Sequence, residues 1–177
     1  MTAGRRRSVP LACMALAVAA LAAPLVVQLP ARIVYNPSAS VARGWYRIGP
    51  VRGPGSLHSG SIVLARLPAG VAAFAGQRGY LPGGVPILKR VGAVAPQSVC
   101  VCNHLVRIDG DTVATIRTHD GAHRLMPAWA SCRPLVHGEL FLLSSTNQAS
   151  FDSRYFGPID ASAVLGVAYP LWTWEAP

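Results

Sequence analysis

Short apolar runs, separated by glycine, proline and polar residues, follow one another along most of the chain. Their alternating or continuously aliphatic character is typical of β-strands. They predict strands at 61–66, 85–94, 105–108, 112–117, 139–143 and 163–168, after an extended entry at 33–40 and a glycine- and proline-rich connection to about residue 60. Asp109-Gly110, between two of these runs, is a typical two-residue hairpin turn. The pattern therefore predicts a mainly β domain of short strands with a coiled, partly open sheet.

The first thirty residues have a different pattern. A cluster of three arginines at 5–7 precedes an uncharged run, rich in Leu, Ala and Val, over residues 8–30. About twenty apolar residues span a bilayer as a helix, and the arginines favour the cytoplasmic side. The sequence thus predicts an anchor over 1–30 that crosses a membrane once, with the domain of residues 31–177 on the far side. A cleavable signal peptide is the alternative, although Pro24 follows the best Ala-x-Ala triplet and disfavours cleavage there.

The charge balance does not indicate nucleic-acid binding. The formal net charge is +9, and +6 remains when the three arginines of the leader are set aside. The other arginines are scattered singly, without a basic stripe or an RNA-binding signature. We interpret them as a solvated surface that favours the anionic headgroups of inner-membrane lipids.

Three of the four cysteines, Cys100, Cys102 and Cys132, lie in the predicted exported domain, where oxidation is allowed. Either Cys100–Cys132 or Cys102–Cys132 would form a structural disulfide, and the spacing does not choose between them. A Cys-x-Cys pair with one distant cysteine does not by itself indicate zinc. No metal or cofactor is expected.

Lys89 is the only lysine among sixteen basic residues of the Lys and Arg type. In an extended strand it would share a face with Val85, Ile87 and Val91, whereas Arg90 would point to the opposite, polar side. Burial among aliphatic side chains lowers the pKa of an ammonium group, and arginine could not serve as a base because it keeps its proton. Lys89 is therefore a candidate general base, the alternative being a lysine whose amine reaches solvent.

Two serines follow directly after the predicted anchor. Ser38 and Ser40 lie in a segment of small residues after Pro37 and would project to the same side if the chain stays extended. One hydroxyl could attack a carbonyl while the other helps to stabilise the oxyanion. An ordinary serine-containing turn is the alternative.

Three segments together resemble the conserved boxes of signal peptidases that use a Ser–Lys dyad. Residues 37–42 (Pro-Ser-Ala-Ser-Val-Ala) resemble the nucleophile box, 88–91 (Leu-Lys-Arg-Val) the lysine box, and 147–158 the late box containing Asp-Ser-Arg-Tyr-Phe-Gly. The short chain and the Asn-x-Ser-x-Ser-x-x-x-Gly-x-Tyr form of the first box are most similar to the TraF branch of conjugal-transfer peptidases. Val41, Ala42 and the 95–97 segment depart from the usual residues, which leaves the chemistry intact and the substrate preference open.

The resemblance implies a role for each matching residue. Ser40 would be the nucleophile and Lys89 the general base, while Ser38 would support the oxyanion and Ser150 would orient the amine. Asp152 would be part of the catalytic set, as in the TraF branch, and would pair with Arg154. A purely structural ion pair is the alternative for these last two residues.

The implied function is cleavage of a membrane-tethered, pilin-like precursor at small residues, by an enzyme anchored in the bacterial inner membrane with its domain in the periplasm. Water would release a linear product, and an amino group of the substrate would release a cyclic one. The alternatives are a general leader peptidase for exported proteins, a non-catalytic periplasmic scaffold of a mating or secretion apparatus, and a cytoplasmic self-cleaving repressor. The apolar leader and the lack of a DNA-binding helix pair count against the repressor.

Overall fold

The computed structural model describes residues 13–14, 16–17, 32–144 and 146–174. The chain divides into two units, Met1–Arg32 and Ile33–Pro177. The predicted anchor, like the alternative signal peptide, lies almost wholly outside the described residues. Among the residues that are described, no helix combines the length and the hydropathy needed to cross a bilayer.

The second unit is mainly β, which confirms the predicted fold class. Its helices are α2 (Ala69–Gln77) and α3 (Ser153–Phe156), and short 3-10 turns occur at Pro54–Ser56 and Ala161–Ala163. The strands are β1 (Arg32–Asn36), β2 (Gly44–Gly49), β3 (Ile62–Ala65), β4 (Ile87–Val94), β5 (Ser98–Cys102), β6 (Leu105–Ile108), β7 (Asp111–Thr115), β8 (Cys132–Pro134), β9 (Glu139–Leu142), β10 (Ile159–Asp160) and β11 (Val164–Thr173).

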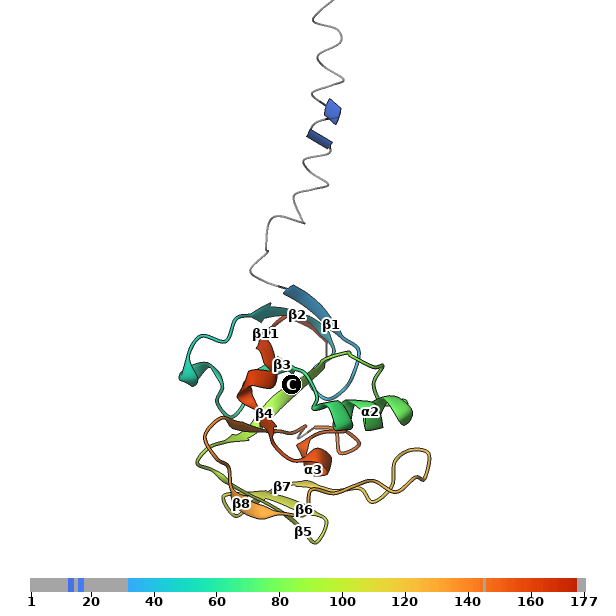
Figure 1. Ribbon diagram of the computed structural model, residues 1–177, viewed down its shortest axis with the longest axis vertical. Coiled ribbons are helices and arrows are strands. Elements are labelled where there is room, and N and C mark those ends of the chain that lie inside the picture. The colour runs from blue at the N-terminus through green and yellow to red at the C-terminus, as the bar shows by residue number, and fades with distance from the viewer. Residues whose placement is uncertain (1–12, 15, 18–31, 145, 175–177) are drawn as a thin grey trace, which may run out of the picture. The chain divides into compact units, whose positions relative to one another are not determined.

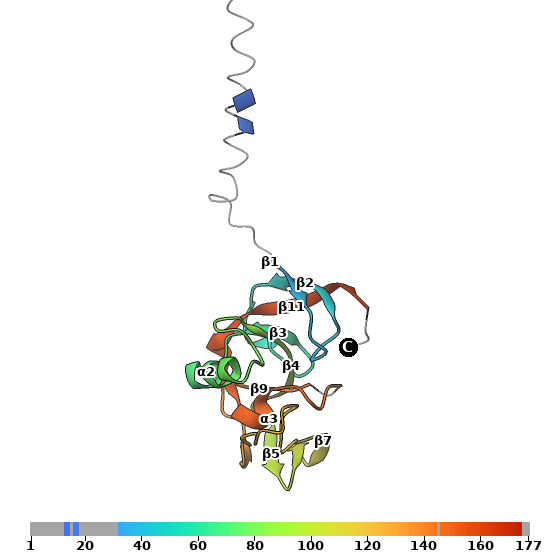
Figure 2. The same ribbon diagram turned by 90° about the vertical axis from the view of Figure 1, so that its right-hand side faces the viewer.

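In the described part of the chain these strands form two sheets. The larger has the order β1-β2-β11-β3-β4-β9-β10, and the smaller has the order β7-β6-β5-β8. In both views the small sheet lies below the large one, and α2 lies beside the large sheet (Figures 1 and 2). Figure 2 shows β9 on the side of the large sheet that is nearer to the small one. Because β11 pairs with both β2 and β3, this C-terminal strand lies in the sheet between two strands from the first half of the chain.

The core consists of three apolar clusters, one on each face of the large sheet and one against the small sheet. Tyr46, Leu64 and Leu88 belong to the first, and Val63, Ile87 and Val91 to the second. The third joins residues such as Val99 and Val106 of the small sheet to Phe141 of β9. Both faces of β4 are therefore buried, which explains why its sequence is almost continuously apolar.

The predicted strands are confirmed, with end points that differ by a few residues. Asp109 and Gly110 both have positive φ, 52° and 96°, as the predicted two-residue hairpin between β6 and β7 requires. The largest difference is β11, which continues to Thr173 through an irregularity between Pro170 and Trp172. Hydrogen bonding to β2 extends this strand beyond its apolar run.

Several elements were not predicted. The strand β2 has a clear in–out alternation, but its flanking glycines and prolines favoured a connection. The helix α2 was missed because Gly70 and Gly76 weaken its helical signal, and within it only Ala75 is buried. The strands β5 and β8 and the one-turn helix α3 were also missed, because short elements carry little periodicity.

Gly166 of β11 allows the backbones of two neighbouring strands to approach closely. A Cβ atom at this position would lie 2.4 Å from the Gly49 carbonyl oxygen and 2.6 Å from Cγ2 of Ile48. These contacts are shorter than van der Waals separations, and one of the atoms belongs to backbone that cannot move without breaking the pairing. The close β2–β11 contact therefore depends on glycine.

Gly166→Ala should destabilise the protein by about 2 kcal/mol, in the range expected for an overpacked core. Gly70→Ala in α2 is the matched control, because a Cβ atom at that position would have no neighbour within 4 Å, and it should raise stability by up to about 1 kcal/mol. Chemical denaturation of both full-length variants measures the difference. Equal stability of Gly166→Ala and the wild type would contradict the close packing.

Candidate active site

A tight turn between β1 and β2 carries the predicted nucleophile. The buried amide of Asn36 organises this turn: its Nδ2 donates to the carbonyls of Ser38 (2.8 Å) and Ala42 (3.0 Å). Its Oδ1 accepts from the backbone N–H and the hydroxyl of Ser38. The Tyr46 hydroxyl donates to the Ala42 carbonyl at 2.6 Å. These bonds fix the turn with Ser40 directed inward, only 8% exposed.

Lys89 lies in the middle of β4, directly opposite Val63 of β3, and is 5% exposed. Its Nζ lies 2.6 Å from Oγ of Ser40 and 2.5 Å from Oγ of Ser150. The two hydroxyls are themselves 3.3 Å apart. The fold therefore brings one amine and two hydroxyls, from three distant segments, into mutual hydrogen-bond contact.

Burial lowers the pKa of Lys89 from its usual 10.5 to about 8. Two charges modify this effect in opposite directions, the carboxylate of Asp152 raising the pKa and the guanidinium of Arg154 lowering it. A substantial neutral fraction is then present just above neutral pH. A neutral amine in contact with a hydroxyl can accept its proton, so the geometry and the pKa both suit a general base.

Asp152 and Arg154 form a fully buried ion pair. Arg154 Nε lies 2.7 Å from Oδ1 of Asp152 and Nη2 lies 2.9 Å from Oδ2. Oδ2 also accepts the backbone N–H of Ser144 at 3.0 Å. The remaining donors of the guanidinium reach the carbonyls of Ser144 (2.7 Å) and Thr115 (2.8 Å). The pair thus fixes the segment that carries Ser150 and acts on Lys89 through its charges.

An apolar cleft with a volume of about 820 Å³ opens beside Ser40 and Lys89. Its apolar lining includes Leu64, Leu81 and Phe151. Asp120 fixes the far wall, because its carboxylate accepts from the Tyr80 hydroxyl (2.5 Å) and from Arg124 Nε (2.7 Å). The cleft can hold an extended apolar peptide segment with its backbone against the nucleophile.

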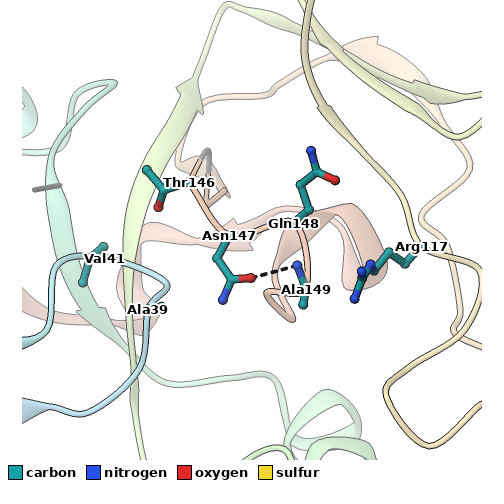
Figure 3. A pocket seen from close by; sticks show the side chains of 7 residues that line it. All are labelled: Ala39, Val41, Arg117, Thr146, Asn147, Gln148 and Ala149. Atoms are coloured by element: carbon teal, nitrogen blue, oxygen red, sulfur yellow. Dashed lines mark hydrogen bonds between the residues drawn. The ribbon is translucent and has the colours of Figure 1, made fainter. Parts of the chain in front are cut away.

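A smaller pocket of about 460 Å³ adjoins the cleft (Figure 3). Ala39 and Val41, the neighbours of the nucleophile, form one side of it, and residues 146–149 form the other. Arg117 completes the lining and also borders the apolar cleft. The site therefore extends away from Ser40 in more than one direction.

Ser38 lines the cleft, as an oxyanion donor would, but its hydroxyl donates to Oδ1 of Asn36 at 2.9 Å. Donation to a substrate oxygen would require rotation of this side chain. Its oxyanion role stays a prediction.

Two sequence-based expectations in this region were wrong. The entry segment does not stay extended to Ser40, because β1 ends at Asn36 and residues 38–41 form a turn. Val85 was expected on the buried face with Lys89, but it precedes β4 and is exposed. Ile87 and Val91 lie together in one apolar cluster, as predicted, but the opposite face of β4 is not polar, because Leu88 is buried there in another cluster. Arg90 is half-buried and donates from Nη1 to the Gly60 carbonyl at 2.9 Å, on the other side of the strand.

Sequence reasoning missed several supporting residues. Asn36 precedes Pro37, and a residue before proline is predicted only to have an extended backbone. The hydrogen bonds of its amide to the following turn have no sequence signature. Ser144 and Tyr155 were missed because their roles depend on contacts with distant segments: the Tyr155 hydroxyl accepts the backbone N–H of Arg117 at 3.3 Å.

The cysteines assemble on the small sheet. Cys100 and Cys132 form a disulfide between β5 and β8, which decides between the two predicted pairings. The free thiol of Cys102 lies 3.6 Å from Sγ of Cys100. The three sulfurs lie within 4.8 Å of one another, but two of them are joined covalently and are not available as thiolate ligands in this state.

Known proteins are similar to this chain over most of its length. The chain is 34% identical over 155 residues to the plasmid transfer protein TraF of Escherichia coli, which covers 81% of this chain and 83% of that protein. It is 36% identical over 150 residues to the conjugal transfer protein TraF of Agrobacterium fabrum strain C58, with 79% and 82% covered.

Among solved structures, a signal peptidase I from Enterococcus faecalis V583 is similar with a TM-score of 0.39 and 18% identity. That match covers 66% of this chain and 97% of the other. Residues 5–173 match the sequence profile of the family described as "Signal peptidase, peptidase S26". The match extends over nearly the whole chain, including all three predicted boxes, and the chain therefore belongs to the signal peptidase family.

Proposed function

We propose that the chain is a serine endopeptidase in which Ser40 is the nucleophile and neutral Lys89 is the general base. The observation that carries this proposal is the 2.6 Å contact between a buried amine and a buried hydroxyl at the edge of an apolar cleft. Membership of the signal peptidase family supports the same chemistry.

Acylation would begin when Lys89 Nζ accepts the proton of the Ser40 hydroxyl as Oγ attacks the scissile carbonyl carbon. The protonated amine would then donate that proton to the leaving nitrogen, so that the peptide bond breaks and an ester to Ser40 remains. Ser150 would orient Nζ through its hydroxyl, which is within hydrogen-bond distance. Ser38 and the backbone N–H of Ser40 would stabilise the negative oxygen.

Deacylation would use the same base. Lys89 would take a proton from an attacking water, or from an attacking amine of the substrate, and Ser40 would leave with a proton returned to Oγ. Water gives a linear product, whereas an amine of the same chain gives a cyclic one.

The proposed substrate is a membrane-tethered precursor of the pilin type with small residues before the scissile bond. The apolar cleft beside Ser40 supports small apolar side chains, and the names of the relatives, plasmid and conjugal transfer proteins, support a role in conjugation. We place the enzyme in the inner membrane, with residues 1–30 as anchor and the catalytic unit in the periplasm, in contact with membrane lipids.

A general leader peptidase is the second candidate, since the family as a whole carries that description. Rescue of a strain depleted of its own signal peptidase would favour this broad role. Failure to rescue, together with cleavage of one pilin precursor, would favour the dedicated enzyme.

Ser40→Ala and Lys89→Met should each lower the rate of precursor cleavage by about a thousand-fold or more, because either change removes a reacting group. Mass spectrometry of candidate precursors incubated with the full-length protein measures the products. Methionine fits the apolar surroundings of Lys89, so that variant should remain folded. Ser162→Ala is the control, because Ser162 is exposed and outside the cleft. Unchanged processing by the first two variants would favour a non-catalytic scaffold.

The value of kcat/KM should rise about ten-fold per pH unit below pH 8 and level off above it. The base must be neutral, and Lys89 with a pKa of about 8 becomes neutral as the pH rises through that value. Initial rates between pH 6 and pH 9.5, with protein stability followed in parallel, test this. A flat profile down to acid pH would exclude Lys89 as the base.

Asp152→Asn should shift this pH profile to lower pH. The carboxylate raises the pKa of Lys89, and its loss also leaves the opposing charge of Arg154 uncompensated. The same variant should lose about 3–5 kcal/mol of stability, as expected when one partner of a buried ion pair is removed. Asp160→Asn is the control, since Asp160 is an exposed carboxylate. A loss of rate without a shift of the profile would contradict the electrostatic role.

A further inference from the structure

Three cysteines lie together on the outer face of the small sheet. Cys100 and Cys102 are two residues apart in β5, so their side chains point to the same side of the strand. Cys132 of β8 lies opposite Cys100 and is joined to it by the disulfide. Val99 and Val101, which alternate with them, are buried in the third apolar cluster, so the sulfurs face away from the core. Cys132 is exposed, and the other two cysteines are half-buried.

The register of β5 and β8 explains why the disulfide joins this pair. The N–H of Val101 donates to the Ser131 carbonyl at 2.8 Å, so the neighbouring pair, Cys100 and Cys132, occupies a non-hydrogen-bonded position of the antiparallel ladder. Side chains approach each other most closely at such positions. The interstrand disulfide therefore follows from the hydrogen bonding of the two strands.

Cys102 has a free thiol in contact with this disulfide. Its Sγ lies 3.6 Å from Sγ of Cys100. A thiolate that reaches a disulfide sulfur can attack it and displace the other sulfur. A bond between Cys100 and Cys102 is compatible with the strand, because a rise of about 3.3 Å per residue puts their Cα atoms about 6.6 Å apart, within the range that disulfides span.

We propose that Cys100, Cys102 and Cys132 form a thiol–disulfide exchange site. The Cys102 thiolate would attack Sγ of Cys100, and a bond between these two sulfurs would form as the bond to Cys132 breaks. Cys132 would leave as a thiolate and take up the proton that Cys102 had released, so the step needs no external oxidant or reductant. The product is an intrastrand disulfide and a free, exposed thiol on β8, which an external disulfide could reach.

The exchange would remove the covalent link between β5 and β8, and backbone hydrogen bonds would remain. Three residues before Cys132, the N–H of Trp129 donates to the Arg154 carbonyl at 3.1 Å. The indole of Trp129 lies against Gly157, where a Cβ atom would be 2.6 Å from Cδ1 of the ring. The exchange site is therefore connected through a short segment to α3, which carries one partner of the buried ion pair.

Slow alkylation followed by peptide mapping tests the exchange. Full-length Cys13→Ser protein, in which the other free thiol is removed, is incubated with iodoacetamide in slight excess and without reductant. Acid quenching and digestion with pepsin stop the exchange, because thiols are then protonated. Mass spectrometry identifies the labelled cysteine. About 1–10% of the label should be on Cys132 and the rest on Cys102, as expected for a minor state in equilibrium with the resting one.

Cys102→Ser, also in the Cys13→Ser background, is the matched control. This variant keeps the disulfide between Cys100 and Cys132 but has no thiol to attack it, so the label on Cys132 should fall by about ten-fold or more. Because the proposed step is intramolecular, the labelled fraction in the parent protein should not change when the protein is diluted about ten-fold.

The outcomes are distinct. Label confined to Cys102 overturns the proposal, and so does label on Cys132 that is equally strong in the Cys102→Ser variant. Label on Cys100 in place of Cys132 would show attack on the other sulfur and overturns the assigned step. A labelled fraction that falls on dilution would show exchange between molecules and contradicts the site. None of these measurements requires peptidase activity, so the proposed function stands or fails separately.

Discussion

The buried ion pair between Asp152 and Arg154 is the interaction on which the functional part of this structure depends. Both side chains are wholly removed from solvent, where an unpaired charge would be strongly destabilising. Each is therefore held by several bonds: Asp152 accepts the Ser144 amide, and Arg154 reaches the Ser144 and Thr115 carbonyls. Through these bonds one pair connects the end of β9, the segment with Ser150 and the end of β7. A change in any of these would move the hydroxyl that contacts Lys89.

The same pair contributes to the acidity of the proposed base. Lys89 is buried, which favours its neutral form, while Asp152 and Arg154 act on it in opposite directions. The result, a pKa of about 8, leaves the amine partly neutral near physiological pH without losing all of its basicity. A buried amine reduces the stability of the fold, and an apolar residue at this position would pack better. The chain nevertheless has a lysine there, as expected for a residue kept for function rather than for stability.

The surroundings of Ser40 and Lys89 differ in polarity from one pocket to the other. The large cleft is mainly apolar, whereas the smaller pocket presents the Arg117 guanidinium and the Asn147 amide. Arg117 lies two residues after Thr115, the last residue of β7, whose carbonyl accepts from Arg154. The contacts that hold the proposed catalytic groups therefore also hold the segment that borders both pockets. In the proposed enzyme, the shape of the pockets and the pKa of Lys89 would both depend on the packing of α3.

The sequence by itself determined the mainly β class and the β6–β7 hairpin, and its resemblance to signal peptidases indicated Ser40, Lys89 and Ser150 as partners. The fold class follows from the short runs of apolar residues, and the hairpin follows from its Asp-Gly turn. The three partners follow from short motifs that can be identified without knowing how the chain between them folds. Only the tertiary structure decided the Cys100–Cys132 pairing, the organising role of Asn36, the place of Arg117 beside the cleft and the exposure of Val85. Each depends on contacts between segments far apart in the chain, or on the residue at which a strand begins. Local residue patterns do not indicate which distant segments will lie side by side in the folded protein.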